Sequence, residues 1–447
     1  MMFCDFDKSF DTIEKTRKPN ESFCLTVHAE ISDYIRFNHA RVRQAGRVNQ
    51  AEASLSYQMG TSKSVSLSFS LNDDVDMNTK RLSDALERVR RLTDALHDDL
   101  YLVSFEKSEN SQAVFNADLP PVEETVAFIS ETTGDLDLVG LLTQGHVLRY
   151  VRHTEGTKHS FETQSLVFDY SVYGARGADG SIQSVKQVVY ATKDVHAMIS
   201  ESLAKAIQQL TDLAKPIKLL PPANYRVYLE PAAVSDIISL FSWNGVSAAS
   251  YKKGASALTQ WIDGKVILSP QVSISDDFTI GLSPRFNSRG ELAPTCLTIA
   301  NKGRFTNLLV SSRTAKEYGL TSTFANGGEG LSSINMTPGT LEKSEILSAL
   351  GTGIYISNVH YLNWSDPNSA RITGMTRFAC FWVENGTIQG PIQDMRFDDS
   401  IYSLFGEQLE AVTAFTEVLP ETDTYDERSI GGSCVPGVLV KEMTFTL

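Results

Sequence analysis

The sequence predicts an α+β protein in which an N-terminal antiparallel sheet with helices packed on it is followed by a β-rich C-terminal domain. Alternating apolar and polar runs between residues 22 and 71 are separated by turn-forming residues, as in an antiparallel meander. Helical apolar stripes follow, and strand-like runs dominate after Pro221-Pro222. The length of 447 residues also favours more than one domain.

The N-terminal elements follow in order. After the meander, Leu82, Leu86, Val89 and Leu96 form one stripe of a helix predicted from about residue 78 to residue 98. Pro120-Pro121 precede a second helix, and long strands cover about 136–153, 160–174 and 181–192. His153 and His159 flank a turn between two of these strands, and we expect that turn to be exposed to solvent. A third long helix covers about 194–215.

We place the domain boundary between residues 217 and 218, because Lys215-Pro216 ends the third helix and Pro221-Pro222 stiffens the chain beyond it. This gives an N-terminal domain of residues 1–217 and a C-terminal domain of residues 218–447. The C-terminal domain reads as strands interrupted by helices at about 231–242, 340–350 and 402–416.

The composition excludes several classes of protein. The net charge of −14 disfavours binding to the phosphates of nucleic acids, and no run of about 18 apolar residues could span a membrane. The start of the chain is too charged for a secretory signal, so a cytoplasmic location is predicted. Five widely spaced cysteines argue against a disulfide framework. The eight histidines are scattered, and no metal-binding or hydrolase motif stands out.

Three segments of the C-terminal half resemble the TldD/PmbA family, also called the modulator of DNA gyrase family. The first is a strand that runs through Glu230-Pro231 into a helix. The second is the polar turn at residues 363–369, followed by Gly374 and by the strand and turn at 381–388. The third is residues 432–440. Their order and spacing match over about 225–447, which implies a metalloprotease-like C-terminal domain.

In TldD-type chains of this family, the helix after the Glu-Pro strand carries His-Glu-x-x-x-His, which binds zinc and supplies a general base for peptide hydrolysis. Counting forward from Glu230-Pro231, the motif falls on residues 239–244, where Ser239, Leu240 and Asn244 replace its histidines and glutamate. The chain is therefore closer to the TldE/PmbA branch, which lacks the motif. The resemblance implies no catalytic residue, metal or cofactor in this chain, and zinc in a TldD-like partner.

TldD-type chains take a third zinc ligand from a cysteine in a Gly-x-Cys context, and Cys434 occupies such a context here. A cysteine without the two histidines does not hold zinc in an open catalytic site. We interpret Cys434 as a remnant or a small buried residue.

The segment at 363–377 is the best candidate for holding a peptide. Its Asp-Pro-Asn-Ser turn leads into a strand that would place Arg371, Thr373 and Arg377 on one face. An extended peptide beside such a strand edge would be held by β-augmentation, with an arginine on a carboxylate. Alternatively, the arginines pair with Asp394, Asp398 or Asp399 within the domain. The candidate residues are Asn363, Asp366, Ser369, Arg371, Thr373 and Arg377.

The resemblance implies a non-catalytic, TldE-like subunit that pairs with a zinc-bearing TldD-like metallopeptidase and helps bind unfolded or precursor peptides for cleavage. Two alternatives remain open. One is a stand-alone peptide-binding homodimer, and the other is a hydrolase with a relocated active site, such as Cys434 with His360. The aromatic residues Phe378, Phe381 and Trp382 are predicted to lie in a core or a subunit interface.

Overall fold

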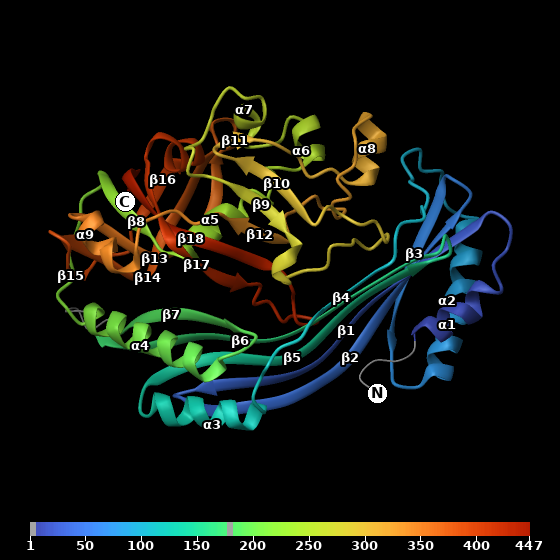
Figure 1. Ribbon diagram of the computed structural model, residues 1–447, viewed down its shortest axis with the longest axis horizontal. Coiled ribbons are helices and arrows are strands. Elements are labelled where there is room, and N and C mark those ends of the chain that lie inside the picture. Colours follow the sequence, from blue (N-terminus) through green and yellow to red (C-terminus); the bar gives the residue numbers. More distant parts are fainter. Residues whose placement is uncertain (1–5, 177–181) are drawn as a thin grey trace.

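The computed structural model describes residues 6–176 and 182–447, which form two β-sheets with helices around them (Figure 1). Residues 21–191 build a long curved sheet of seven strands, and residues 224–444 build a sheet of eleven. The second sheet and its helices lie against one face of the first (Figure 1). The predicted α+β class is confirmed. The predicted boundary at 217/218 falls between the last helix of the first part and the first strand of the second.

The first sheet has the order β3-β2-β1-β5-β6-β4, with β7 also paired to β6. All its pairs are antiparallel except β4 with β6. Its strands are β1 (Glu21–Asn38), β2 (Arg41–Met59), β3 (Lys63–Leu71), β4 (Ser111–Phe115), β5 (Asp137–His153), β6 (Thr157–Arg176) and β7 (Ile182–Ala191).

Four helices cover the face of this sheet that points away from the second sheet. At one end α1 (Phe6–Glu14) and α2 (Val75–Thr93) pack on a core that contains Leu25, Leu55 and Tyr57. At the other end α3 (Val122–Thr133) and α4 (Val195–Leu213) pack on a core that contains Leu142 and Phe168. The helices predicted from apolar stripes are therefore present, although α2 ends at Thr93 rather than near residue 98.

The second sheet has the order β11-β10-β9-β12-β18-β8-β13-β14-β15, with β16 paired to β14 and β17 paired to β18. Its strands are β8 (Asn224–Leu229), β9 (Ile274–Asp277), β10 (Cys296–Asn301), β11 (Arg304–Phe305), β12 (Ser333–Met336), β13 (Gly353–Asp366), β14 (Arg371–Glu384), β15 (Thr387–Pro391), β16 (Arg396–Ser400), β17 (Leu409–Pro420) and β18 (Gly432–Thr444).

The helices of the second part are short: α5 (Pro231–Ser239), α6 (Ala248–Lys252), α7 (Thr259–Ile262), α8 (Ser312–Tyr318) and α9 (Ile346–Leu350). The helix predicted at 402–416 is wrong. Only residues 401–407 are helical, and β17 begins at Leu409, with Ala411 and Val412 paired to Leu439 and Val438 of β18. The backbone N–H and C=O groups of this stretch are hydrogen-bonded within the sheet. Strand pairing therefore outweighs the helix-like spacing of the apolar residues.

The junction between the two parts buries the histidines that were expected in solvent. His153 and His159 are 1% and 0% exposed. His153 stacks on Phe105, and His159 stacks on Phe286 of the second part while its Nε2 lies 3.0 Å from the carbonyl oxygen of Gly290. Burial lowers the pKa of His153 to about 4. The expectation that these histidines are exposed is wrong, because Phe105 covers His153 and Phe286 covers His159, whereas Gly156 at the turn itself is exposed.

Phe381 is 1% exposed and belongs to the core that α4 shares with β14, which confirms the core prediction for this aromatic side chain. No helix in the described part of the chain is long and apolar enough to cross a membrane.

Candidate functional site

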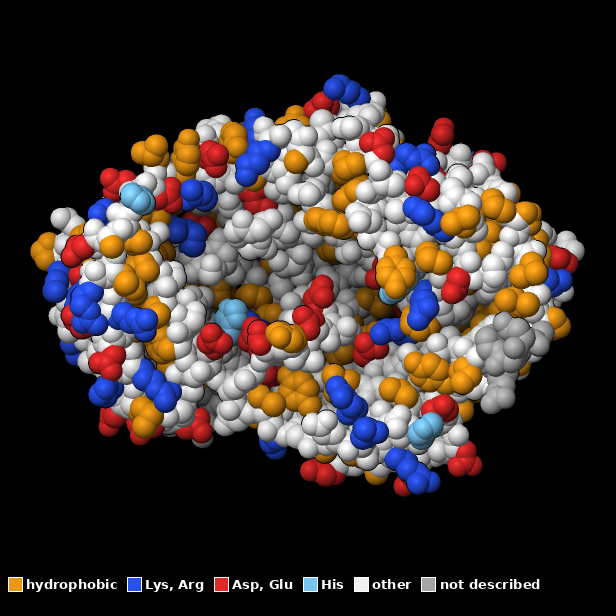
Figure 2. All heavy atoms as spheres, turned by 180° about the vertical axis from the view of Figure 1, so that it is seen from behind, with side chains coloured by type: hydrophobic (Ala, Val, Ile, Leu, Met, Phe, Trp, Pro, Cys, Tyr) orange, Lys and Arg blue, Asp and Glu red, His pale blue; other side chains and the backbone are white. Residues whose placement is uncertain are grey.

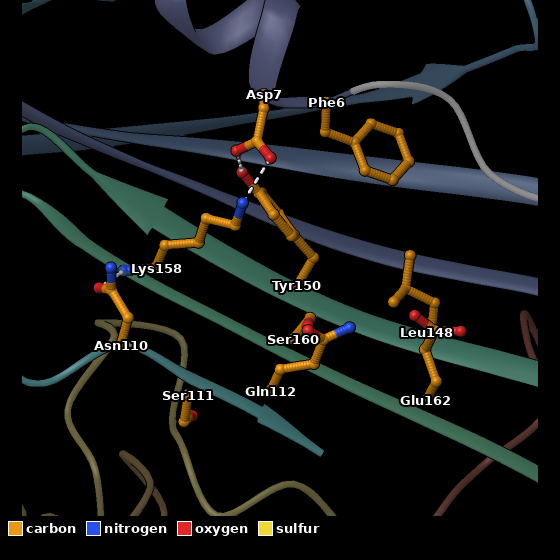
Figure 3. Close-up of a pocket in the computed structure, with 10 residues that line it drawn as sticks. All are labelled: Phe6, Asp7, Asn110, Ser111, Gln112, Leu148, Tyr150, Lys158, Ser160 and Glu162. Carbon is orange, nitrogen blue, oxygen red and sulfur yellow. Dashed lines mark hydrogen bonds and ion pairs between the residues drawn. The ribbon is translucent and has the colours of Figure 1, made fainter. Parts of the chain in front are cut away.

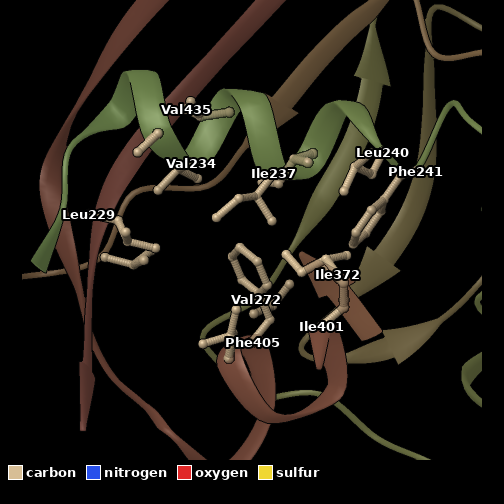
Figure 4. Packing of buried hydrophobic residues seen from close by; sticks show 14 of the residues in the cluster. Leu229, Val234, Ile237, Leu240, Phe241, Val272, Ile372, Ile401, Phe405 and Val435 are labelled. Carbon is tan, nitrogen blue, oxygen red and sulfur yellow. The ribbon is translucent and has the colours of Figure 1, made fainter. Parts of the chain in front are cut away.

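Helix α5 is the element on which the resemblance places the zinc motif. It begins with Pro231 in its first turn, where the missing N–H costs nothing, and the amide of Val234 donates to the carbonyl oxygen of Glu230. The helix lies in the middle of the largest apolar core, with Val234 and Ile237 on its buried face (Figure 4).

Ser239 is the last residue of α5, Leu240 caps the helix, and Asn244 lies in the turn that follows. Leu240 is 4% exposed and points into the core beside Phe241 (Figure 4). Ser239 is exposed, and its Oγ donates to the carbonyl oxygen of Asp236 at 2.7 Å. Asn244 is exposed with φ of 57°, and its Oδ1 accepts from Ser250 Oγ at 3.1 Å. These side chains pack in the core or make local hydrogen bonds at the end of the helix.

Cys434 lies on β18 and is half-buried. Its Sγ is 3.3 Å from Thr416 Oγ1 of the neighbouring strand β17. His360 lies on β13 and contacts Tyr361. Within residues 6–176 and 182–447, no hydrogen bond or ring contact joins Cys434 to His360, so the structure offers no support for a relocated active site built on this pair.

The peptide-binding candidates occupy the β13–β14 hairpin. At its tip Asp366 accepts from the amide of Asn368 at 3.1 Å and from Ser369 Oγ at 2.5 Å, which confirms the predicted tight turn. Thr373 Oγ1 donates to the carbonyl oxygen of Phe397 at 3.0 Å. Asn363 is exposed on β13 opposite Thr373.

The strand edge expected at residues 371–375 is already occupied. β14 pairs with β13 on one side and with β16 on the other along this stretch, so a peptide cannot add there as a further strand. The two arginines differ. Arg371 Nε donates to Asp398 Oδ1 at 2.8 Å, as the alternative within the domain predicted. Arg377 is exposed, lies over the ring of Phe378 at 5.1 Å and makes no salt bridge with a described residue.

The Glu-Pro segment has a role that the sequence did not reveal. Glu230 is 4% exposed, and its carboxylate accepts from Lys205 Nζ at 2.6 Å, from Gln209 Nε2 at 2.9 Å and from Tyr355 Oη at 2.5 Å. Lys205 and Gln209 belong to α4 of the first part, and Tyr355 belongs to β13. Glu230 therefore joins helix α4 to the second sheet through charge-assisted hydrogen bonds.

Two carboxyl groups of the second part that lie near lysines of the first part have raised pKa values. Burial raises the pKa of Asp236 on α5 to about 7, although the charge of Lys186 on β7 opposes the shift. Burial also raises the pKa of Glu417 on β17, which lies 3.9 Å from Lys205 Nζ. Burial alone would lower the pKa of Lys205, but Glu230 and Glu417 outweigh it and raise that pKa. The junction therefore holds protonatable groups from both parts.

A cleft of about 660 Å³ lies between the first sheet and the segment that precedes β18. Hydroxyl groups of β1, β2 and β3 line it, together with His28, Glu52, Asp426 and Glu427. Its wall is fixed by a hydrogen bond between His28 Nδ1 and Glu427 at 2.9 Å and by Arg149 Nη2 at 3.2 Å from the same carboxylate. Seen from behind, the molecule is hollowed in its middle (Figure 2).

Comparison with known proteins gives a match to one family profile. The PmbA/TldA metallopeptidase C-terminal domain matches residues 222–447, which is just over half of the chain. The chain belongs to the TldD/PmbA family. No curated protein sequence matches it.

Solved structures share the whole fold of this family member. TldE from Thermococcus kodakarensis aligns with a TM-score of 0.79 and 14% identity over 99% of this chain and 100% of that chain. A protein from Thermotoga maritima, proposed to be a modulator of a DNA gyrase, aligns with a TM-score of 0.74 and 15% identity over 99% of each chain. A protein from Bacteroides thetaiotaomicron, also proposed to be such a modulator, aligns with a TM-score of 0.74 and 15% identity over 100% of both chains.

The zinc that the family implies does not fit this chain at the expected place. Leu240 has no ligand atom, and the hydroxyl of Ser239 and the amide of Asn244 are poor zinc ligands. Within the described residues, no group of three or more His, Cys, Asp or Glu side chains lies together as a metal site would require. No catalytic step through zinc can be assigned to these side chains.

Proposed function

We propose that this chain is a non-catalytic, TldE/PmbA-like subunit that pairs with a zinc-bearing TldD-like metallopeptidase and helps bind unfolded or precursor peptides for cleavage. The observation that carries the proposal is the end of α5. Where a zinc-bearing relative would present its glutamate, Leu240 packs into the core beside Phe241. A leucine in this position can neither bind a metal nor accept a proton.

The contribution to peptide binding would come from polar surfaces of the chain. The 660 Å³ cleft presents hydroxyl and carboxylate groups that suit the backbone amides of an extended peptide. On the hairpin, Arg377 is the better candidate for a peptide carboxylate, because the guanidinium of Arg371 is bound to Asp398. Asn363, Asp366, Ser369 and Thr373 are then candidates for shaping the hairpin or an interface.

In this proposal the zinc belongs to the partner, and both the maturation of peptides and their proteolysis take place in the pair. The chain would work in the cytoplasm as one half of a dimer, with no role in binding nucleic acid, in line with its net charge of −14.

The test is co-purification of the full chain with a TldD-like chain from the same host, followed by a peptide-cleavage assay of the pair. We expect a stable complex that cleaves peptides, and neither chain alone should match its rate. Arg377→Ala should raise the KM for peptides and leave the complex assembled. Arg371→Lys, which keeps the charge beside Asp398, is the matched control. A chain that never associates with such a partner would overturn the proposal.

A second candidate, a stand-alone peptide-binding homodimer, is favoured by one observation: the hydroxyl-lined cleft is complete within one chain. Peptide binding by the isolated chain, with no gain when the partner is added, would select this candidate.

A further inference from the structure

A small cavity lies in the second part of the molecule, between strand β9 and the loop that follows helix α8. Its volume is about 40 Å³, and apolar side chains that include Phe278, Phe286 and Phe324 form much of its lining. Phe324 is 43% exposed, so the cavity opens to solvent at this loop. One water needs about 10–15 Å³ of such space, so the cavity has room for the end of one side chain and excludes a nucleotide or a sugar.

Asp276 of β9 brings a carboxylate into this cavity. The residue is 4% exposed, and its Oδ1 accepts from the amides of Ser332 at 3.1 Å and Ser333 at 2.7 Å. Its Oδ2 accepts no hydrogen bond from a described residue and keeps accessible surface. A ligand group in the cavity can therefore reach this oxygen.

The carboxylate of Asp276 also lacks a cationic partner. For comparison, Asp7 in a cavity of the first sheet accepts from Lys158 Nζ at 2.5 Å and from Tyr150 Oη at 2.8 Å (Figure 3). Asp276 makes no salt bridge with a described residue, and burial raises its pKa, to which the charge of Asp277 adds. A buried carboxylate without a counterion is costly, so a cation in the cavity would stabilise it.

The other lining residues favour a cation that ends an aliphatic chain. The rings of Phe286 and Phe324 offer apolar surface to methylene groups, and a ring face attracts an ammonium group. Arg285 also lines the cavity, but its Nη1 donates to Thr295 Oγ1 at 2.7 Å and it makes no salt bridge with a described residue. Its positive charge would oppose the binding of a second cation without neutralising Asp276 by direct contact.

The cavity borders the end of helix α5. Gly330 and Ser332 line it, and the amide of Leu331 between them donates to Ser242 Oγ at 3.0 Å. Ser242 belongs to residues 239–244, where the zinc motif of a TldD-type chain would stand. A side chain in the cavity would therefore belong to a peptide that lies beside this end of the helix.

We propose that this cavity takes the side chain of a lysine from an extended peptide. The ammonium group donates to Asp276 Oδ2, and the methylene groups pack on Phe286 and Phe324. The small volume favours the compact ammonium of lysine over the larger guanidinium of arginine. The proposal rests on the proposed peptide-binding function for the source of the lysine, but the cavity lies within one chain and its test needs no partner.

Ligand-observed NMR of the full chain tests this proposal with two tripeptides that have blocked ends, acetyl-Ala-Lys-Ala-amide and its norleucine analogue, which lacks the ammonium group. We expect the wild-type chain to bind the lysine peptide at least about tenfold more tightly, the scale of a hydrogen bond to a charged group. Asp276→Asn keeps the shape and an acceptor for the two amides, and it should abolish this preference. Arg285→Gln should strengthen binding of the lysine peptide about twofold, because it removes an opposing charge.

The matched control is Asp277→Asn, which removes the neighbouring carboxylate, whose Oδ2 accepts from Asn335 outside the cavity lining. Its affinity for the lysine peptide should stay within about twofold of the wild type. Thermal unfolding without peptide verifies that each variant is folded. Equal weakening by Asp276→Asn and Asp277→Asn, or equal binding of the two peptides by the wild-type chain, would overturn the proposal. A failure to pair with a TldD-like chain is a separate result, because this test uses one chain alone.

Discussion

The two ends of helix α5 were shaped by opposite requirements. At its N-terminal end the carboxylate of Glu230 is buried, with three donors from α4 and β13 around it. At its C-terminal end, where the zinc motif of a TldD-type chain would stand, Leu240 and Phe241 are buried in an apolar core. One end holds a charge that joins the two parts of the molecule, and the other end buries apolar side chains.

The largest expected effect comes from the apolar end. Phe241→Ala should lower the free energy of unfolding by about 3–5 kcal/mol, because it leaves a cavity beside Trp261 and Leu240. Chemical denaturation measures the loss. The neighbouring exposed variant Ser239→Ala is the control and should stay within about 0.5 kcal/mol of the wild type. If Phe241→Ala lowered the free energy of unfolding as little as Ser239→Ala, this end of the helix would not be a packed core.

The charged end should give the second largest effect. Glu230→Gln keeps the shape of the side chain but leaves Lys205 without its closest carboxylate, and we expect a loss of about 2–3 kcal/mol. Limited proteolysis between α4 and β8 should become faster, because the contact joins these elements. Wild-type stability in this variant would show that the junction is held by apolar packing alone.

Asp236 should make the free energy of unfolding depend on pH. Its pKa rises from an ordinary value of 3.8 to about 7 on folding, so the protonated form is favoured in the folded chain and stability is lost as the pH rises through 7. Asp236→Asn should therefore stabilise the protein by about 1–3 kcal/mol at pH 8 and change little below pH 4. Unfolding curves at the two pH values measure the difference. An equal effect at both would contradict the assignment.

The smallest effect is expected at Cys434. Its thiol contacts Thr416 and is half-buried, so Cys434→Ala should cost about 1 kcal/mol or less. A much larger loss, or a change in bound metal, would show that the thiol has a role beyond packing.

The sequence predicted the elements whose signals are local. The stripe of Leu82, Leu86 and Val89 identified α2, and Glu230-Pro231 marked the start of α5. Contacts between segments that are far apart in the sequence could not be predicted. Lys205 and Gln209 meet Glu230 only because α4 folds back on the second sheet, and the ring of His159 is covered by Phe286, which is more than 100 residues away in the sequence.

In the candidate site, too, local features were predicted and long-range contacts were not. The absence of zinc ligands at 239, 240 and 244 follows from counting residues, whereas the strand β16 that closes the edge beside Arg371 comes from a segment about 25 residues further along the chain. The 402–416 segment was assigned to a helix because its apolar spacing suits either structure, and only its partner β18 decides in favour of a strand.

The most direct test of the central claim is the zinc content of this chain purified without any partner, measured by mass spectrometry of the metal after dialysis against zinc. The account predicts no stoichiometric zinc in the wild-type chain and no change in Cys434→Ala. One zinc per chain that is lost in Cys434→Ala, together with peptide cleavage by the chain alone, would contradict it.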